Sequence, residues 1–124
     1  MITDPAITFA IRLDIRRRLF PVDAVCACGE WRSVGFVEGS RPLRCYECDR
    51  VRRGFPRWED HHVGGQGTPL PLVRVPANLH RVLSDLQDVG WRGRASPGSA
   101  DAVRFDFVAL VVMGFAWHEP RRQP

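Results

Sequence analysis

Four cysteines, arranged as two close pairs, constrain the fold of this chain more than any other feature. Cys26 pairs with Cys28 and Cys45 with Cys48, and sixteen residues (29–44) separate the two pairs. Two such pairs, each on a tight turn, can place four thiolates tetrahedrally about one zinc ion. Four thiolates leave no open coordination position, so the spacing predicts a structural zinc site rather than a catalytic one.

The alternative is that the four cysteines are buried thiols or form disulfides, and the choice depends on the compartment. No secretory signal is visible, because Arg12 and Asp14 interrupt the apolar N-terminal segment. The longest apolar run, from Phe107 to Trp117, is too short to span a bilayer. We therefore expect a cytoplasmic protein with no membrane partner, in a compartment where disulfides are rare.

The composition is that of one folded domain with a basic surface. A chain of 124 residues can bury a modest core, and a bound metal would add stability. The net charge is +4, and all 18 basic residues are arginine. Arginine binds phosphate through its planar fork of donors, so this balance favours nucleic acid as a partner. A GC-rich genome would give the same bias towards arginine without any ligand.

Basic residues are dense around the second cysteine pair. Six arginines fall within residues 41–57, where Glu47 and Asp49 are the only acids. The four that we expect to contact nucleic acid are Arg50, Arg52, Arg53 and Arg57. The alternative is a solvated charged surface that binds no ligand.

The two ends of the chain predict helices. Asp4 precedes a proline, as is typical of a helix start, and the apolar residues that follow predict a helix over residues 4–20. The same residues also alternate in a way that suits a strand. Near the other end, Ser99 or Asp101 would cap an apolar helix over residues 101–117, for which a strand is again the alternative.

The middle of the chain predicts short elements. Residues 26–58 are rich in turns, and within them residues 31–37 predict a strand that a turn follows. Residues 70–75 predict a second short strand, and a helix would run from Asn78 to Gln87. We expect Asn78 to cap this helix.

The segment EDHHVGGQG, residues 59–67, places His61 and His62 side by side before a glycine-rich loop. A hairpin that ends at these histidines and returns through the strand at 70–75 would lead into the helix. His80 lies in the first turn of that helix. A β-β-α unit would therefore bring His80 back beside His61.

Together these features are similar to those of a known enzyme family. The segment EDHHVGG, the strand that ends in VP and the helix start NLHRVLS, preceded by two cysteine pairs, resemble the HNH endonucleases with their ββα-metal finger. The resemblance covers about residues 26–87. It implies an HNH-like ββα-metal unit (59–87) that follows the four-cysteine zinc region (26–58). From the length of the chain we expect a single domain, 1–124, with an α+β fold. The N-terminal helix and the apolar C-terminal helix would flank the ββα-metal unit.

The resemblance also implies a catalytic site. His61 and His80 would bind a divalent metal, Asp60 would complete its coordination or orient a ligating imidazole, and His62 would act as the general base. Two imidazoles and a carboxylate suit Mg²⁺, Mn²⁺, Ni²⁺ or Zn²⁺. The implied reaction is hydrolysis of phosphodiester bonds in nucleic acid, with DNA the expected substrate. His62 would take a proton from the attacking water, and the metal would stabilise charge on the phosphate.

The sequence departs from the family at the residue that holds the base histidine. The family has an asparagine there, whereas residues 63–75 contain none. Gln66 or Thr68 would have to take this role. The alternative function is a zinc-stabilised module that binds nucleic acid or protein without cutting, and a third is an assembly subunit that forms a homodimer through its apolar C-terminal segment.

Overall fold

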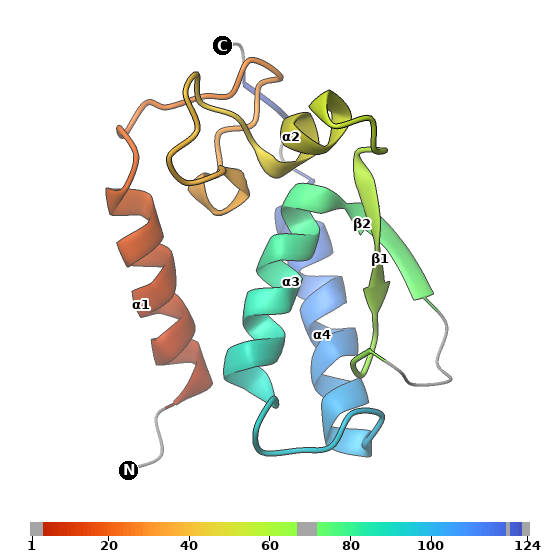
Figure 1. Cartoon of the computed structure of the whole chain (residues 1–124). Helices are drawn as coiled ribbons and strands as arrows, with labels where there is room; N and C mark the ends of the chain where they lie inside the picture. The colour runs from red at the N-terminus through yellow and green to blue at the C-terminus, as the bar shows by residue number, and fades with distance from the viewer. Residues whose placement is uncertain (1–3, 67–71, 119, 123–124) are drawn as a thin grey trace.

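A central helix connects the other parts of the fold. The computed structural model describes residues 4–66, 72–118 and 120–122. Within these residues the chain has four α-helices and one two-stranded antiparallel sheet, which is an α+β fold. Figure 1 shows α3 (Ala77–Gly90) at the centre, with α1 (Pro5–Arg18) on one side and the hairpin on the other.

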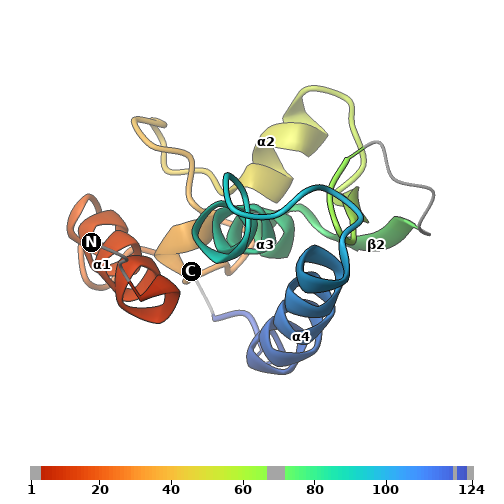
Figure 2. The same cartoon turned by 90° about the horizontal axis from the view of Figure 1, so that it is seen from below.

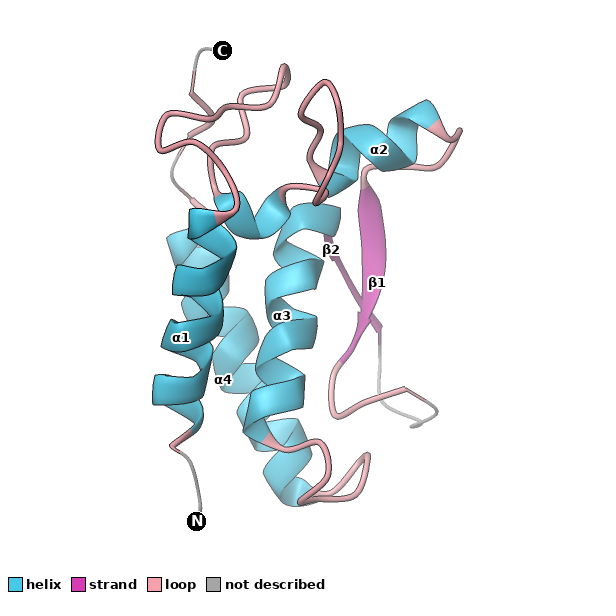
Figure 3. Cartoon of the chain, turned by 60° about the vertical axis from the view of Figure 1, so that its left-hand side comes forward, coloured by secondary structure: helices cyan, strands magenta, loops and turns pink. Residues whose placement is uncertain are grey.

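The remaining elements surround α3. They are a short 3-10 helix (Ser33–Gly35), α2 (Tyr46–Arg52), β1 (Trp58–His62), β2 (Leu72–Pro76) and α4 (Ala100–Ala116). Seen from below in Figure 2, α1 and α4 lie on different sides of α3. Figure 3 shows α2 beside the first turns of α3 and the hairpin running along the length of α3.

Local sequence explains α1. The Asp4 side chain accepts a hydrogen bond of 2.8 Å from the Ala6 amide, and the proline at the first helical position fits the helix start. The helix predicted over residues 4–20 is thus confirmed, and the strand alternative is wrong. No residue of α1 is buried. A cavity of about 950 Å³, lined mainly by apolar side chains, includes residues of both α1 and α4 in its lining.

The hairpin and α3 form the predicted β-β-α unit. β1 pairs antiparallel with β2, and α3 begins at the residue after β2. Residues 70–71 of the predicted second strand lie outside the described residues. Val75 on β2 packs with Leu79 and Leu83 of α3, and apolar residues of α4 cover this cluster. The unit therefore has a core of its own, closed by α4.

The strand predicted over residues 31–37 is wrong. The 3-10 helix lies there instead, and Phe36 pairs with Cys45 in an isolated β-bridge. Gly35 packs against α3 so closely that a Cβ atom would lie 3.0 Å from Asn78 Cγ. Packing against α3 therefore overrides the local preference for a strand.

Asn78 does not cap α3, and that prediction is also wrong. The helix begins at Ala77 with Pro76 as its N-cap, and the Asn78 side chain is buried. Its Oδ1 accepts a hydrogen bond from the Glu47 amide (3.0 Å), and its Nδ2 donates to Glu30 Oε1 (2.9 Å). The side-chain amide serves partners from distant parts of the chain, so it is not free to cap its own helix.

α4 is an apolar helix with much of its surface exposed. Ser99 caps it by accepting a hydrogen bond of 3.2 Å from the Ala102 amide. The predicted helix is confirmed, and the strand alternative is wrong. The exposed large apolar side chains of this helix are Phe107, Val108, Val111, Val112 and Phe115. Of the helices described, none is both long and apolar enough to cross a membrane.

Candidate metal centre

The four cysteines lie together near the start of α3. Their Sγ atoms all lie within 4.8 Å of one another, a group that could hold a metal ion. The Sγ atoms of Cys26 and Cys48 are 3.7 Å apart, and those of Cys28 and Cys45 are 3.6 Å apart. A tetrahedral site with Zn–S bonds of about 2.3 Å has sulfur separations of about 3.8 Å, whereas disulfide sulfurs are about 2.05 Å apart. All four thiols are free, and their spacing fits zinc.

Two turns position the sulfur atoms. In the first, the Gly29 amide donates to the Cys26 carbonyl at 2.7 Å. In the second, Cys45 caps α2, and its Sγ accepts a hydrogen bond of 3.4 Å from the Cys48 amide. The Cys45 amide in turn donates to Cys26 Sγ at 3.4 Å. Amide donors directed at sulfur stabilise the thiolate form, which is the form that binds metal.

Burial of the cysteine group opposes the thiolate form in the absence of metal. It raises the pKa of Cys48 to about 11 and also raises the pKa of Cys45. Burial would raise the pKa of Cys26 as well, but hydrogen bonds from the backbone of Cys28 and Cys45 lower it below its usual value. Zinc must displace the remaining protons, so metal binding by this group strengthens as the pH rises.

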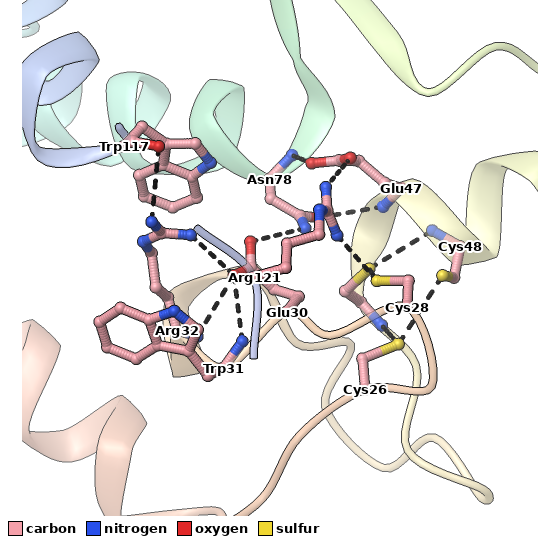
Figure 4. A network of polar contacts seen from close by, with 11 residues as sticks. Cys26, Cys28, Glu30, Trp31, Arg32, Glu47, Cys48, Asn78, Trp117 and Arg121 are labelled. Carbon is pink, nitrogen blue, oxygen red and sulfur yellow. Dashed lines mark hydrogen bonds and ion pairs between the residues drawn. The ribbon is translucent and has the colours of Figure 1, made fainter. Parts of the chain in front are cut away.

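A buried network of carboxylates joins the cysteine turns to α3 (Figure 4). Glu30 and Glu47 are almost fully buried, and both bind Asn78, whose amide also donates to Glu47 Oε2 at 3.3 Å. Arg32 Nη1 lies 2.9 Å from Glu30 Oε2, and the Arg32 guanidinium lies 4.3 Å from the ring centroid of Trp117. The network therefore connects the cysteine region, α3 and the end of α4.

The acids of this network have only a weak sequence signal. Glu47 lies within the second cysteine pair and Glu30 lies two residues after Cys28, so their positions beside the ligands were the available sign. Their shared partner, Asn78, is 31 residues from Glu47 and 48 residues from Glu30 along the chain. No local pattern predicts a contact over such separations.

The two histidines predicted to bind a catalytic metal lie where β1 faces α3. His61 is 1% exposed, and its ring centroid lies 5.5 Å from that of His80. Neither ring nitrogen of His61 has a hydrogen-bond partner within the described part of the chain. His80 Nδ1 lies 2.9 Å from Glu59 Oε2. His61 thus lies beside His80, and His80 contacts Glu59, but among the described residues only the four cysteines form a group of three or more potential ligands close enough to hold a metal ion.

Asp60 and His62 face the other side of β1. Adjacent residues of a strand face opposite sides, so Asp60 and His62 alternate with Glu59 and His61 along β1. Asp60 Oδ1 lies 3.7 Å from Arg74 Nε on β2. Asp60, which the resemblance implies as a further ligand or as a group that orients a ligating imidazole, therefore faces the side of the hairpin opposite to His61, whereas Glu59 contacts His80.

The residues predicted to hold the base histidine lie beyond β1. Gln66 is exposed in the turn that follows the strand, and Thr68 lies outside the described residues. The end of β1 is held from α3 instead, because Gln87 Nε2 donates to the His62 carbonyl at 3.1 Å. The same nitrogen donates to the buried Asp106 at 2.8 Å. Gln87 was predicted only as the end of a helix, and its spacing from His62 gave no sign of this contact.

The protonation state of His61 follows from its surroundings. Burial, and to a smaller extent the neighbouring His80, lowers the pKa of His61 to about 4. Its imidazole is therefore neutral at pH 7, and the neutral form is the one that donates a lone pair to a metal.

The four arginines predicted to contact nucleic acid differ in their surroundings. Arg50 connects α2 to β1, since its Nη1 lies 3.6 Å from Glu59 Oε1. The Arg52 and Arg53 side chains are 61% and 66% exposed, and both pair with Asp49 of α2. Arg57 is partly exposed. Exposed ion pairs are weak, so Arg52 and Arg53 are accessible to a phosphate.

The comparisons with known proteins do not identify a family for this chain. No protein-family model, curated protein or solved structure matches this chain. The resemblance to HNH endonucleases rests on the residues of the β-β-α unit and on the two cysteine pairs that precede it. The structure itself shows a small α+β fold with a cysteine group that could hold a structural metal ion such as zinc.

Proposed function

We propose that the protein is a zinc-stabilised, metal-dependent nuclease of the HNH type that hydrolyses phosphodiester bonds in nucleic acid, with DNA the expected substrate. The observation that carries the proposal is the buried imidazole of His61, which lies beside His80 and has no hydrogen-bond partner among the described residues. Burying such a group without a partner is costly. A metal ion bound to His61 would offset that cost.

His61 and His80 are the proposed ligands of this second metal. Glu59, which contacts His80, would either ligate the ion or orient the His80 imidazole. Two or three protein ligands leave coordination positions open for water and a phosphate oxygen. When bound, a divalent ion such as Mg²⁺, Mn²⁺, Ni²⁺ or Zn²⁺ would act as a Lewis acid towards the phosphate.

His62 is the proposed general base. It is partly exposed at the end of β1, and the hydrogen bond from Gln87 to its carbonyl fixes the backbone there. Histidine is the commonest general base in enzymes, and His62 would take the proton of the water that attacks phosphorus. Gln66 or Thr68, in the loop after β1, would orient its ring.

A cavity beside Glu59 is the proposed place for a phosphate group of the substrate, although none of the three histidines lines it. Its volume is about 340 Å³, and its lining residues are Arg50, Pro56, Trp58, Glu59, Asp60 and Arg74. Arg50 and Arg74 would attract a phosphate group, while the exposed Arg52 and Arg53 would extend contact along the backbone of the nucleic acid. Such contacts predict weak sequence specificity and strong dependence on salt.

Cleavage of supercoiled plasmid tests the proposal. Wild type, His62→Ala, His80→Ala and the control His118→Ala, which changes an exposed histidine, are incubated with Mg²⁺, Mn²⁺ or Ni²⁺. We expect metal-dependent nicking by wild type and control, and a loss of about 100-fold or more in His62→Ala, because general bases contribute about 10²–10⁴-fold. If wild type leaves the plasmid intact with every metal while still retarding it on a gel, the nuclease proposal fails.

A module that binds without cutting is the second candidate, and the burial of His61 favours it. A side chain that is 1% exposed does not touch a substrate, so a metal at His61 would then serve stability alone. The predicted ligand Asp60 is engaged with Arg74 on the other side of the hairpin. For this candidate, we expect equal retardation of DNA by wild type and His62→Ala with no cleavage by either.

A further inference from the structure

The end of the chain returns to the cysteine group. Residues 120–122, which we call the C-terminal tail, lie beside the first cysteine pair (Figures 1 and 4). Arg121 Nη1 donates to Cys28 Sγ at 2.8 Å, and Arg121 Nη2 donates to Glu47 Oε1. One guanidinium therefore contacts both cysteine turns, because Cys28 belongs to the first and Glu47 to the second. The contacts span 93 and 74 residues of sequence.

The backbone of the tail fits closely against the first turn. The Arg122 amide donates to the Gly29 carbonyl at 2.8 Å. Gly29 has a φ of +94°, and a Cβ atom there would clash with the Arg122 carbonyl oxygen and lie 2.9 Å from Arg121 Cβ. Glycine is therefore required at position 29 both for the turn conformation and for the approach of the tail.

Trp31 also contacts the tail. The Arg122 guanidinium lies 3.9 Å from the centroid of the Trp31 ring, and Trp31 Nε1 donates to the Pro120 carbonyl at 3.4 Å. A guanidinium over an indole face contributes about 0.5–1 kcal/mol at an exposed site. All three tail residues thus contact the segment that directly follows the first cysteine pair.

The charges of the centre explain why an arginine is suited to this position. Four thiolates around one divalent ion carry a net negative formal charge, and the buried carboxylate of Glu47 adds to it. The planar fork of Arg121 donates to a thiolate and a carboxylate at once, in a partly buried environment where charge-assisted hydrogen bonds are strong. Loss of the metal would remove the organised thiolates that the fork contacts.

We propose that the C-terminal tail docks on the zinc centre, with Arg121 as the positioning residue. Zinc binding and docking of the tail then strengthen each other. The linkage is reciprocal by thermodynamic necessity. If a docked tail raises the affinity for zinc, bound zinc must favour the docked tail by the same factor. The proposal depends on the cysteine centre and not on nuclease activity.

Zinc affinity of the full chain is the first test. Competition with a chromophoric chelator compares wild type with Arg121→Gln, Arg121→Lys and the control Arg104→Gln, which changes an exposed arginine of α4. We expect Arg121→Gln to weaken zinc binding by about 10-fold or more, as is typical for the loss of a group that contacts a metal ligand. Arg121→Lys keeps one charged donor and should recover part of the affinity, and Arg104→Gln should match wild type.

Trypsin cleavage after Arg121 and Arg122 is the second test, since it reports on the tail directly. In wild type, we expect saturating zinc to slow this cleavage relative to the zinc-free protein. In Arg121→Gln, cleavage after Arg122 should be fast with or without zinc. Should Arg121→Gln fail to fold, the wild-type comparison still decides the matter. Equal zinc affinity in Arg121→Gln and wild type, or tail cleavage in wild type that does not respond to zinc, would overturn the proposal.

Discussion

Buried polar side chains differ in hydrogen bonding between the cysteine group and the β-β-α unit. Around the cysteines, the carboxylates of Glu30 and Glu47 are matched by arginines and by the Asn78 side chain. In the β-β-α unit, by contrast, neither nitrogen of the buried His61 has a hydrogen-bond partner among the residues described. The carboxylates are therefore fully partnered, whereas the contribution of His61 to stability depends on pH and on a ligand.

His61 should make stability depend on pH in the acid range. Its pKa in the folded protein is about 4, below the value of about 6.5 for an unperturbed histidine. The unfolded chain therefore binds more protons between pH 6.5 and pH 4, and stability falls as the pH is lowered through this window. The loss is on the order of 3 kcal/mol. Urea unfolding at several pH values, without added divalent metal, measures it.

The comparison with His61→Leu isolates this effect from acid release of zinc, which acts on both proteins. The difference in unfolding free energy between wild type and His61→Leu should change steadily from pH 6.5 to pH 4. The control His118→Leu, at an exposed position, should keep the wild-type dependence. A difference between wild type and His61→Leu that stays constant across this range would mean that His61 is not buried in its neutral form.

Helix contacts depend on where glycine allows close approach. Gly90, at the end of α3, lies against the ring of Phe105 on α4, and a Cβ atom at Gly90 would overlap that ring. Replacing a helical glycine by alanine normally stabilises a helix by about 1 kcal/mol. At Gly90, overpacking should reverse the sign, and we expect Gly90→Ala to lower stability by about 1–3 kcal/mol. Thermal unfolding followed by circular dichroism measures the change.

Gly114 offers a matched control within α4. Nothing lies within 4 Å of the position that its Cβ would occupy, so Gly114→Ala should raise stability by about 0.5–1 kcal/mol through helix propensity alone. Opposite signs for the two alanine variants would support the packing of α3 on α4. Stabilisation by both would show that the two helices are farther apart at Gly90 than described.

Elements with strong local signals were predictable from the sequence. The caps at Asp4 and Ser99 each depend on neighbouring residues, and the corresponding helices are confirmed. The strand at 31–37 and the cap at Asn78 failed for a shared reason. In both places a contact between the cysteine region and α3 overrides the local preference.

At the candidate sites, too, local patterns were predictable from the sequence and long-range contacts were not. The spacing of the cysteines predicted a metal group because ligand spacing is a local property, and the four thiols do lie together. The choice between Asp60 and Glu59 beside His80 depended on which face of β1 meets α3, which neighbouring residues do not determine. The homodimer through the C-terminal segment stays a prediction, with exposed side chains of α4 such as Phe115 as its expected contacts.

At the scale of the whole molecule, two apolar clusters are joined by polar contacts. One cluster surrounds Cys26, Phe36 and Cys45, and the other joins β2, α3 and α4 around Leu83. Asn78 links them, because its side chain binds the cysteine region while its backbone belongs to the first turn of α3. Stability of the first cluster should therefore depend on zinc far more than stability of the second.

Zinc removal should unfold the cysteine region while the cluster around Leu83 stays folded. We expect about one zinc per chain to survive dialysis, since a closed four-thiolate site holds its ion tightly. After removal by a strong thiolate-competing chelator, hydrogen exchange should accelerate across residues 26–52 and in the first turn of α3. Amides of α3 around Leu83, which pack against α4, should keep most of their protection because their apolar cluster does not include the cysteines.

Mild chelation with EDTA is the matched control, because it should empty the weaker histidine group first and leave exchange across residues 26–52 unchanged. Two results would contradict this division of the molecule. Freshly prepared, reduced protein that is folded but holds no zinc would remove the structural role of the cysteine group. Uniform acceleration of exchange through α3 and α4 after zinc removal would mean that the cluster around Leu83 has no stability of its own, and that the Asn78 contacts make the whole chain one cooperative unit.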